Sequence, residues 1–218
     1  MKHSEILVLL GAFGYAVCLI ADFILEFVNG IRIDINTFTN FQAFLNVTED
    51  VTAVRFAVSG LLGFCSMILI ALGMIGLYEM SKPGAPLLSE FVIAGGIGSA
   101  VLGAGFHLLC TLQPWFFITL GRSEDSFYVL QHFISANKII FILNPIFYTL
   151  MSIPLFIILI SRKTSLPRWS CVFNLLFLFF VLNALHVPGA TSFAGLGMCS
   201  GILIFSIAVR KSRTNNRV

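Results

Sequence analysis

Residues 95–110, GGIGSAVLGAGFHLLC, combine an apolar composition with five glycines and one histidine. Written as a helix, the stretch places Gly95, Ser99, Gly103 and His107 four residues apart, beside a second stripe of small residues. In a bilayer, small residues at this spacing let neighbouring helices approach closely, so this side faces protein. The pattern predicts a central membrane helix whose His107 imidazole points into a helix bundle.

The composition indicates a membrane protein. Of the 218 residues 58% are hydrophobic, whereas soluble domains are roughly 45–50% apolar, and the mean hydropathy is +0.97. Charged residues make up 11% and cluster between long apolar runs, as expected where each run spans lipid. No P-loop and no G-x-S-x-G motif occurs, which argues against an ATP-driven pump and an α/β-hydrolase. The net charge of +3 gives no indication of nucleic acid as a partner.

Six apolar runs predict an all-α bundle of six transmembrane helices in one integral membrane domain. The expected helices cover residues 6–28, 55–79, 90–111, 137–160, 169–187 and 191–209, and each is long enough for a hydrocarbon core about 30 Å thick. An even number of spans puts both termini on one side, and nine of the thirteen Lys and Arg residues lie on that side. We therefore expect cytoplasmic termini, in a bacterial inner membrane or in a eukaryotic endomembrane or plasma membrane.

Two longer loops, Ile31–Val54 and Leu112–Phe127, are rich in Phe and Trp and are expected on the outer side. One interpretation is an interfacial belt of aromatic side chains. The other is a lid that admits a lipophilic molecule. The sequence leaves both open.

Four polar residues on four expected helices share one depth. Asp22, His107, His186 and Asn144 each lie about 24–25 Å from the cytoplasmic end of their helix. Ionisable residues inside a membrane usually face a partner or a cavity. We therefore expect a polar pocket in the outer half of the bilayer. Other polar side chains expected around this pocket are Glu26, Asn183, Arg55 and His132.

Three roles for this polar layer stay open. The first is structural, with hydrogen bonds and ion pairs that fix the packing of the helices. The second is a metal site of Asp22, His107 and His186, a ligand set that suits zinc or iron with an open position. The third is acid–base chemistry without metal, with Asp22 or Glu26 as base and His107 as acid. No contiguous H-E-x-x-H or C-x-x-C motif supports the metal.

These roles imply different functions for the protein. The pocket predicts an integral membrane protein that binds or hydrolyses a lipophilic molecule, with or without a metal. The alternatives are a small transporter or ligand-binding membrane protein, and an accessory protein whose polar layer only fixes helix packing. The sequence leaves open whether the protein catalyses a reaction.

Two segments, GAFGYAVCLIAD at 11–22 and GLYEMSKPGAPLLSEFVIAGGIGSAVLGAGFHLLC at 76–110, carry a resemblance. Here the chain resembles a family of uncharacterised, mostly bacterial six-helix membrane proteins. The matching positions are Ala21–Asp22, Gly76 to Glu79, and Gly103 to His107. The resemblance implies a six-helix fold and a shared polar site, and it names no substrate.

Overall fold

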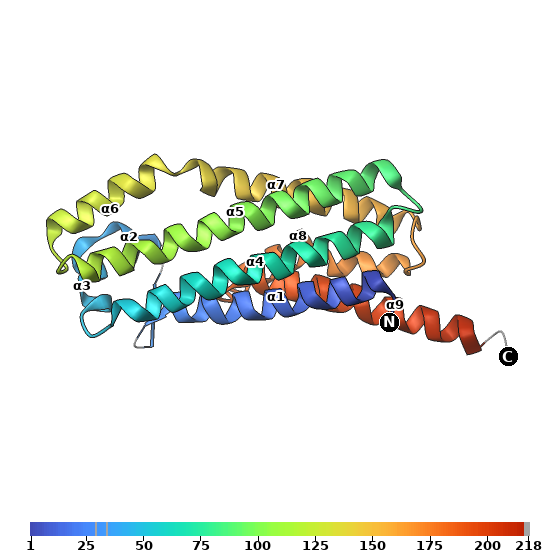
Figure 1. Ribbon diagram of the computed structural model, residues 1–218, viewed down its shortest axis with the longest axis horizontal. Coiled ribbons are helices and arrows are strands. Elements are labelled where there is room, and N and C mark those ends of the chain that lie inside the picture. The colour runs from blue at the N-terminus through green and yellow to red at the C-terminus, as the bar shows by residue number, and fades with distance from the viewer. Residues whose placement is uncertain (29, 34, 216–218) are drawn as a thin grey trace.

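The computed structural model describes residues 1–28, 30–33 and 35–215, and these fold into an elongated bundle of helices (Figure 1). The long helices are α1 (His3–Glu26), α4 (Ala53–Ser81), α5 (Pro86–Thr119), α7 (Ile139–Ile160) and α9 (Ala190–Asn215). The short elements are β1 (Phe27–Val28), β2 (Ile31–Arg32), α2 (Ile35–Thr39), α3 (Phe41–Thr48), α6 (Glu124–Ala136), the 3₁₀ helix η1 (Arg168–Phe173) and α8 (Leu175–Ala184). Strands β1 and β2 form an antiparallel pair with Phe27 opposite Arg32.

Five of the described helices, α1, α4, α5, α7 and α9, are long and apolar enough to cross a membrane. The all-α class is confirmed, and the five helices agree with the prediction of a multi-pass membrane protein. Both termini lie at one end of the bundle, which we call the terminal end; α2, α3 and α6 lie at the other, the loop end (Figure 1). At the terminal end the buried Glu5 carboxylate accepts hydrogen bonds from Arg210 and Ser206, which ties α1 to α9.

The helix expected at 169–187 is divided. Residues 168–173 form η1, and only ten residues continue as α8. Asn174 lies at the break, where its side chain accepts a hydrogen bond from the backbone N–H of Leu176 and donates one to the Ser152 carbonyl of α7. A buried amide thus satisfies a backbone N–H that the break leaves unpaired, as lipid surroundings require, and ties the break to α7.

Helices α1 and α4 lie in direct backbone contact. A Cβ atom built on Gly11 would lie 2.6 Å from the Gly73 Cα, and one built on Gly73 would lie 2.5 Å from the Gly11 Cα. One turn further along each helix, Gly14 and Gly76 meet the backbone of the facing helix in the same way. Small residues therefore close this interface, as is typical of helix contacts in membranes.

The small-residue stripe of α5 faces protein, as predicted. Gly95 lies against the α7 backbone, Gly103 lies under the Met67 side chain of α4, and His107 is buried. However, α5 is not the most enclosed helix, because 44% of the most apolar stretch is buried in α1, α4, α5 and α9 alike, against 28% in α7. Helix α5 also continues beyond its expected end at residue 111, since Phe117 packs into a core at the loop end.

The aromatic residues of the two long loops pack mainly against one another. Phe44 of α3, Phe117 of α5 and Phe127 of α6 are buried together, and the ring centroids of Phe44 and Phe117 are 4.9 Å apart. Phe38 and Phe41 complete this loop-end cluster. The cluster forms a small core of its own at the loop end.

Candidate functional site

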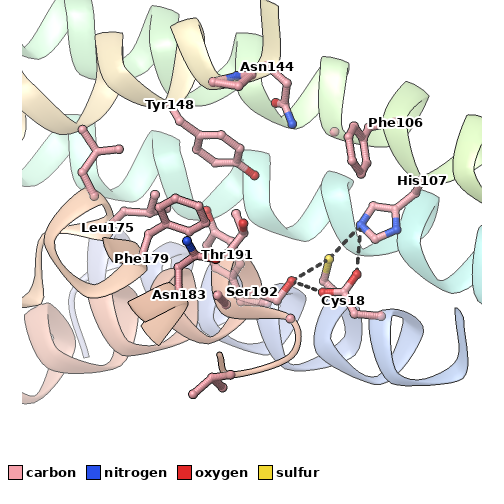
Figure 2. Close-up of a pocket in the computed structure, with 18 of the residues that line it drawn as sticks. Cys18, Phe106, His107, Asn144, Tyr148, Leu175, Phe179, Asn183, Thr191 and Ser192 are labelled. Carbon is pink, nitrogen blue, oxygen red and sulfur yellow. Dashed lines mark hydrogen bonds and ion pairs between the residues drawn. The ribbon is translucent and has the colours of Figure 1, made fainter. Parts of the chain in front are cut away.

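A cavity of about 490 Å³ lies among α1, α5, α7, α8 and the start of α9. Figure 2 shows Cys18, His107 and Ser192 grouped on one side of it, with Tyr148, Leu175 and Phe179 on the other. Its polar lining includes Cys18, Asp22, Glu26, His107, Asn144, Asn183 and Ser192, and its apolar lining includes Phe106, Phe141, Leu175, Leu176 and Phe179. The cavity therefore has its ionisable side chains on the side of Cys18 and His107, whereas the opposite wall is mainly aromatic and aliphatic and also contains the amides of Asn144 and Asn183.

Three side chains that carry ligand atoms converge on the polar side. The Cys18 sulfur lies 3.1 Å from His107 Nε2, and the Asp22 Oδ1 atom lies 3.8 Å from the same nitrogen. Cys18 and Asp22 are four residues apart on α1 and therefore project to the same side. All three donor atoms lie within 4.8 Å of one another. We call Cys18, Asp22 and His107 the polar trio.

The first turn of α9 contributes a further polar side chain, Ser192, which contacts two members of the trio. The Ser192 hydroxyl lies 2.6 Å from Asp22 Oδ2, to which it donates, and 3.3 Å from the Cys18 sulfur. The preceding turn reaches this position through Gly189, whose φ of +61° favours glycine. A Cβ atom at Gly189 would also lie 2.8 Å from the Leu19 side chain. The turn therefore has little space for a larger residue beside Asp22.

The His107 ring packs closely against a glycine of α4. A Cβ atom on Gly63 would lie 2.6 Å from both Cγ and Nδ1 of the imidazole. The Nδ1 atom is buried and has no hydrogen-bond partner among the described residues. In nucleophilic triads a carboxylate holds the imidazole nitrogen that points away from the nucleophile. Here Cys18 and Asp22 both face Nε2, so the trio does not have the geometry of such a relay.

Three other predicted residues line the same cavity. Glu26 lies one turn beyond Asp22 and pairs with Arg32 at 3.3 Å. Asn144 of α7 and Asn183 of α8 belong to its wall. The Asn144 Oδ1 atom is buried and without a partner among the described residues, as is the Tyr15 hydroxyl, which also lines the cavity. Buried polar atoms are normally satisfied, so these two point to a bound molecule or water.

The structure does not bring His186, Arg55 and His132 to the trio. His186 is exposed because α8 ends at Ala184 and the chain turns there, with a φ of +54° at His186. Arg55 donates to the carbonyl groups of Ile24 and Phe27 and so satisfies the end of α1. His132 is exposed on α6 and is not among the lining residues of the cavity.

Sequence reasoning missed two members of the site. Cys18 stands four residues before Asp22, a spacing that places it on the same face, but a cysteine in an apolar run is typically a buried, inert thiol. No sequence pattern around Ser192 indicates that it belongs to the site, because it lies 170 residues from the carboxylate that it contacts. A thiolate, a carboxylate and an imidazole can together hold a transition metal, and without one a thiol–imidazole pair can exchange protons.

Comparison with known proteins identifies the family of the chain. The searches of the curated proteins and of the solved structures found no match. The model of a family of unknown function, DUF6796, matches residues 1–209. Almost the whole chain is covered by this match, which agrees with the predicted resemblance to an uncharacterised family. The chain therefore belongs to the DUF6796 family.

Proposed function

We propose that this protein binds an amphiphilic, lipid-soluble molecule within the membrane, with the polar group of that molecule at the trio. The main support is the cavity of about 490 Å³, which has ionisable side chains on one side and a mainly aromatic and aliphatic wall on the other. Small-molecule sites in proteins are typically clefts of about 300–1,000 Å³ with mostly apolar walls and a few placed polar groups. A molecule with one polar group and a hydrocarbon chain matches this division.

We further propose six crossings with cytoplasmic termini. The 3₁₀ helix η1 and α8 together extend roughly 27 Å, close to the thickness of the hydrocarbon core. The turns after α4 and α7 lie at the terminal end and carry Lys82, Arg162 and Lys163. The excess of basic residues at this end supports a cytoplasmic position. The trio then lies toward the outer leaflet.

We infer that a molecule enters the cavity from the lipid beside α7. Pro145 and Thr149 border both the cavity and an apolar groove of about 610 Å³ on the outside of α5 and α7. The groove is lined by exposed apolar side chains, including Phe91, Ile146 and Ile153. A hydrocarbon chain in the bilayer therefore lies directly against the wall of the cavity.

The charges favour a one-sided pocket over a transport path. Among the described lining residues, the acidic and basic ones are Asp22, Glu26, Arg32 and His107. Asp22 and Glu26 lie in the half of α1 that is nearer the loop end, and Arg32 and His107 each contact one of these carboxylates. A path for ions would need polar lining toward the terminal end as well.

Hydrolysis of the bound molecule is a second candidate function. Its support is the position of the trio at the polar side of the cavity, where a carboxylate and an imidazole can move protons at the ligand. Hydrolysis of amphiphiles with ester or amide bonds, followed by mass spectrometry, tests this function. Activity that survives in both Asp22→Ala and His107→Ala would contradict it.

Photocrosslinking tests the binding function directly. A photoactivatable amphiphile, with a diazirine on its hydrocarbon chain, is added to the protein in membranes and the labelled peptides are mapped. We expect labels within residues 141–149 and 175–183. Leu176→Trp should reduce this labelling because Leu176 lines the cavity, whereas Phe177→Trp should not, because Phe177 is 53% exposed on the same helix. Equal labelling of both variants, or labels confined to the outward face of α4, would contradict the proposal.

A further inference from the structure

We propose that the polar trio binds a divalent transition metal, zinc, with a coordination position open to the cavity. The proposal deepens the proposed function and rests on it for the role of the metal beside a bound amphiphile. Metal binding itself depends only on the three side chains and can be measured without any amphiphile. The ligand set is Cys18, Asp22 and His107, so Cys18 stands where the sequence suggested His186.

Two of the three distances within the trio are close to those of a tetrahedral site, and all three donor atoms lie within 4.8 Å of one another. Zinc bonds of about 2.3 Å to sulfur and about 2.0–2.1 Å to nitrogen and oxygen imply roughly 3.5 Å between sulfur and nitrogen and roughly 3.3 Å between nitrogen and oxygen. The Cys18–His107 and His107–Asp22 distances are 3.1 Å and 3.8 Å. Small side-chain rotations would bring both pairs to these values. Three protein ligands with one open position are the usual arrangement of catalytic zinc.

The charges of the trio balance those of a divalent cation. A thiolate and a carboxylate together carry two negative charges, and such charges are costly in lipid surroundings unless they are paired. Apart from His107, the described lining residues of the cavity include one basic side chain, Arg32, and it pairs with Glu26. A divalent cation would therefore make the buried group neutral.

The hydrogen bonds around the trio also favour a shared cation. His107 Nε2 has one bonding direction, yet both the Cys18 sulfur, at 3.1 Å, and an Asp22 oxygen, at 3.8 Å, lie near it. A thiol–imidazole hydrogen bond would use that direction for Cys18 alone, whereas a metal serves all three atoms. Ser192 donates to the other Asp22 oxygen, as outer-shell groups do for metal ligands. The sulfur ligand excludes Mg²⁺ and Ca²⁺, which prefer oxygen.

Elemental analysis is the first test. The full-length chain is purified in detergent without chelator and loaded with zinc. We expect zinc equimolar with the chain in wild type and its loss in Cys18→Ala, Asp22→Ala and His107→Ala. Cys199→Ala is the matched control, because Cys199 is also a buried cysteine but lies outside the trio, and it should keep the metal. Zinc retained by the three trio variants would overturn the proposal.

Cobalt substitution is the second test. Cobalt bound to a thiolate gives a charge-transfer absorption in the near ultraviolet, which we expect in wild type and Cys199→Ala and not in Cys18→Ser. If the trio variants fail to fold, the absence of this band from folded wild type loaded with cobalt overturns the proposal. Intact photocrosslinking without metal binding would refute the metal site alone. Metal binding without cavity labelling would refute the proposed amphiphile alone.

Discussion

The two sides of this bundle are built on opposite principles. Between α1 and α4, Gly11 and Gly73 bring two backbones into contact and leave no space. Between α7 and α8, Pro145 removes one backbone hydrogen bond from α7, Asn174 stands at the break before α8, and a cavity lies beside them. We call these the closed side and the open side. Small residues remove space between helices, whereas breaks in helices create it.

The polar trio lies on the boundary between the two sides. Cys18 and Asp22 belong to α1, whose other face is fixed against α4, and the His107 ring rests on Gly63 of α4. The closed side thus gives the trio a rigid support, and the open side gives it access to a ligand. Rigid elements hold functional groups in position more accurately than loops do.

The largest effect is expected where the closed side is forced apart. Gly11→Ala adds a methyl group against the backbone of α4, and we expect it to lower the free energy of unfolding by about 2–3 kcal/mol. Gly105→Ala is the control, because its Cβ atom would meet only the Ile140 side chain at 3.5 Å. Alanine favours helix over glycine by up to about 1 kcal/mol, so the control should be neutral or stabilising. Thermal unfolding in detergent measures both, and equal stability of the two variants would contradict the closed interface.

A smaller effect is expected at the boundary. Gly63→Ala should displace the His107 ring, because the added Cβ atom would lie 2.6 Å from it. We expect a loss of about 1–2 kcal/mol of stability and weaker binding of cobalt in a spectroscopic titration. A variant that keeps both the stability and the cobalt affinity of wild type would show that the ring does not depend on this glycine.

On the open side, the break before α8 depends on an amide. Asn174→Ala removes the bond to the Ser152 carbonyl and the cap at Leu176, which should cost about 1–2 kcal/mol. Asn183→Ala is the matched control, since Asn183 is an exposed amide near the end of the same helix and should change stability little. Unfolding measured in parallel tests the difference. Equal losses in the two variants would mean that the break is not held by Asn174.

The smallest effect on stability is expected at Pro145. Proline in a helix removes one backbone hydrogen bond, so Pro145→Ala should change the free energy of unfolding by less than about 1 kcal/mol, toward greater stability. The variant should nevertheless bind less amphiphile, because Pro145 borders both the cavity and the outer groove. Unchanged photocrosslinking would argue that the ligand does not pass this wall.

The sequence predicted the long helices well because lipid-spanning runs and small-residue stripes are local patterns. Asp22 and His107 came together as expected, since each lies on an inward face at similar depth. His186 could have been placed better, because Pro188 and Gly189, which follow Val187, predict the end of a helix. The spacing of four residues between Cys18 and Asp22 could have predicted that Cys18 belongs to the site.

Other features depend on contacts between distant segments. Ser192 reaches Asp22 only because α9 packs along α1. The extension of α5 to Thr119 depends on Phe44 and Phe127, which come from other elements. The break at Asn174 depends on a carbonyl group of α7. No pattern within one segment contains this information.

The reactivity of two buried cysteines tests the contrast between the sides most directly. Cys18 lines the cavity, whereas Cys199 packs beside Gly11 near the closed interface, and both are at most 2% exposed. In chelator-treated single-cysteine variants, a small lipid-soluble maleimide is followed by intact-mass spectrometry. We predict that Cys18 reacts at least roughly tenfold faster, because Cys199 reacts only when helices part, and that an added amphiphile slows Cys18 alone. Equal rates for the two cysteines, or a faster Cys199, would contradict an open cavity at the polar trio.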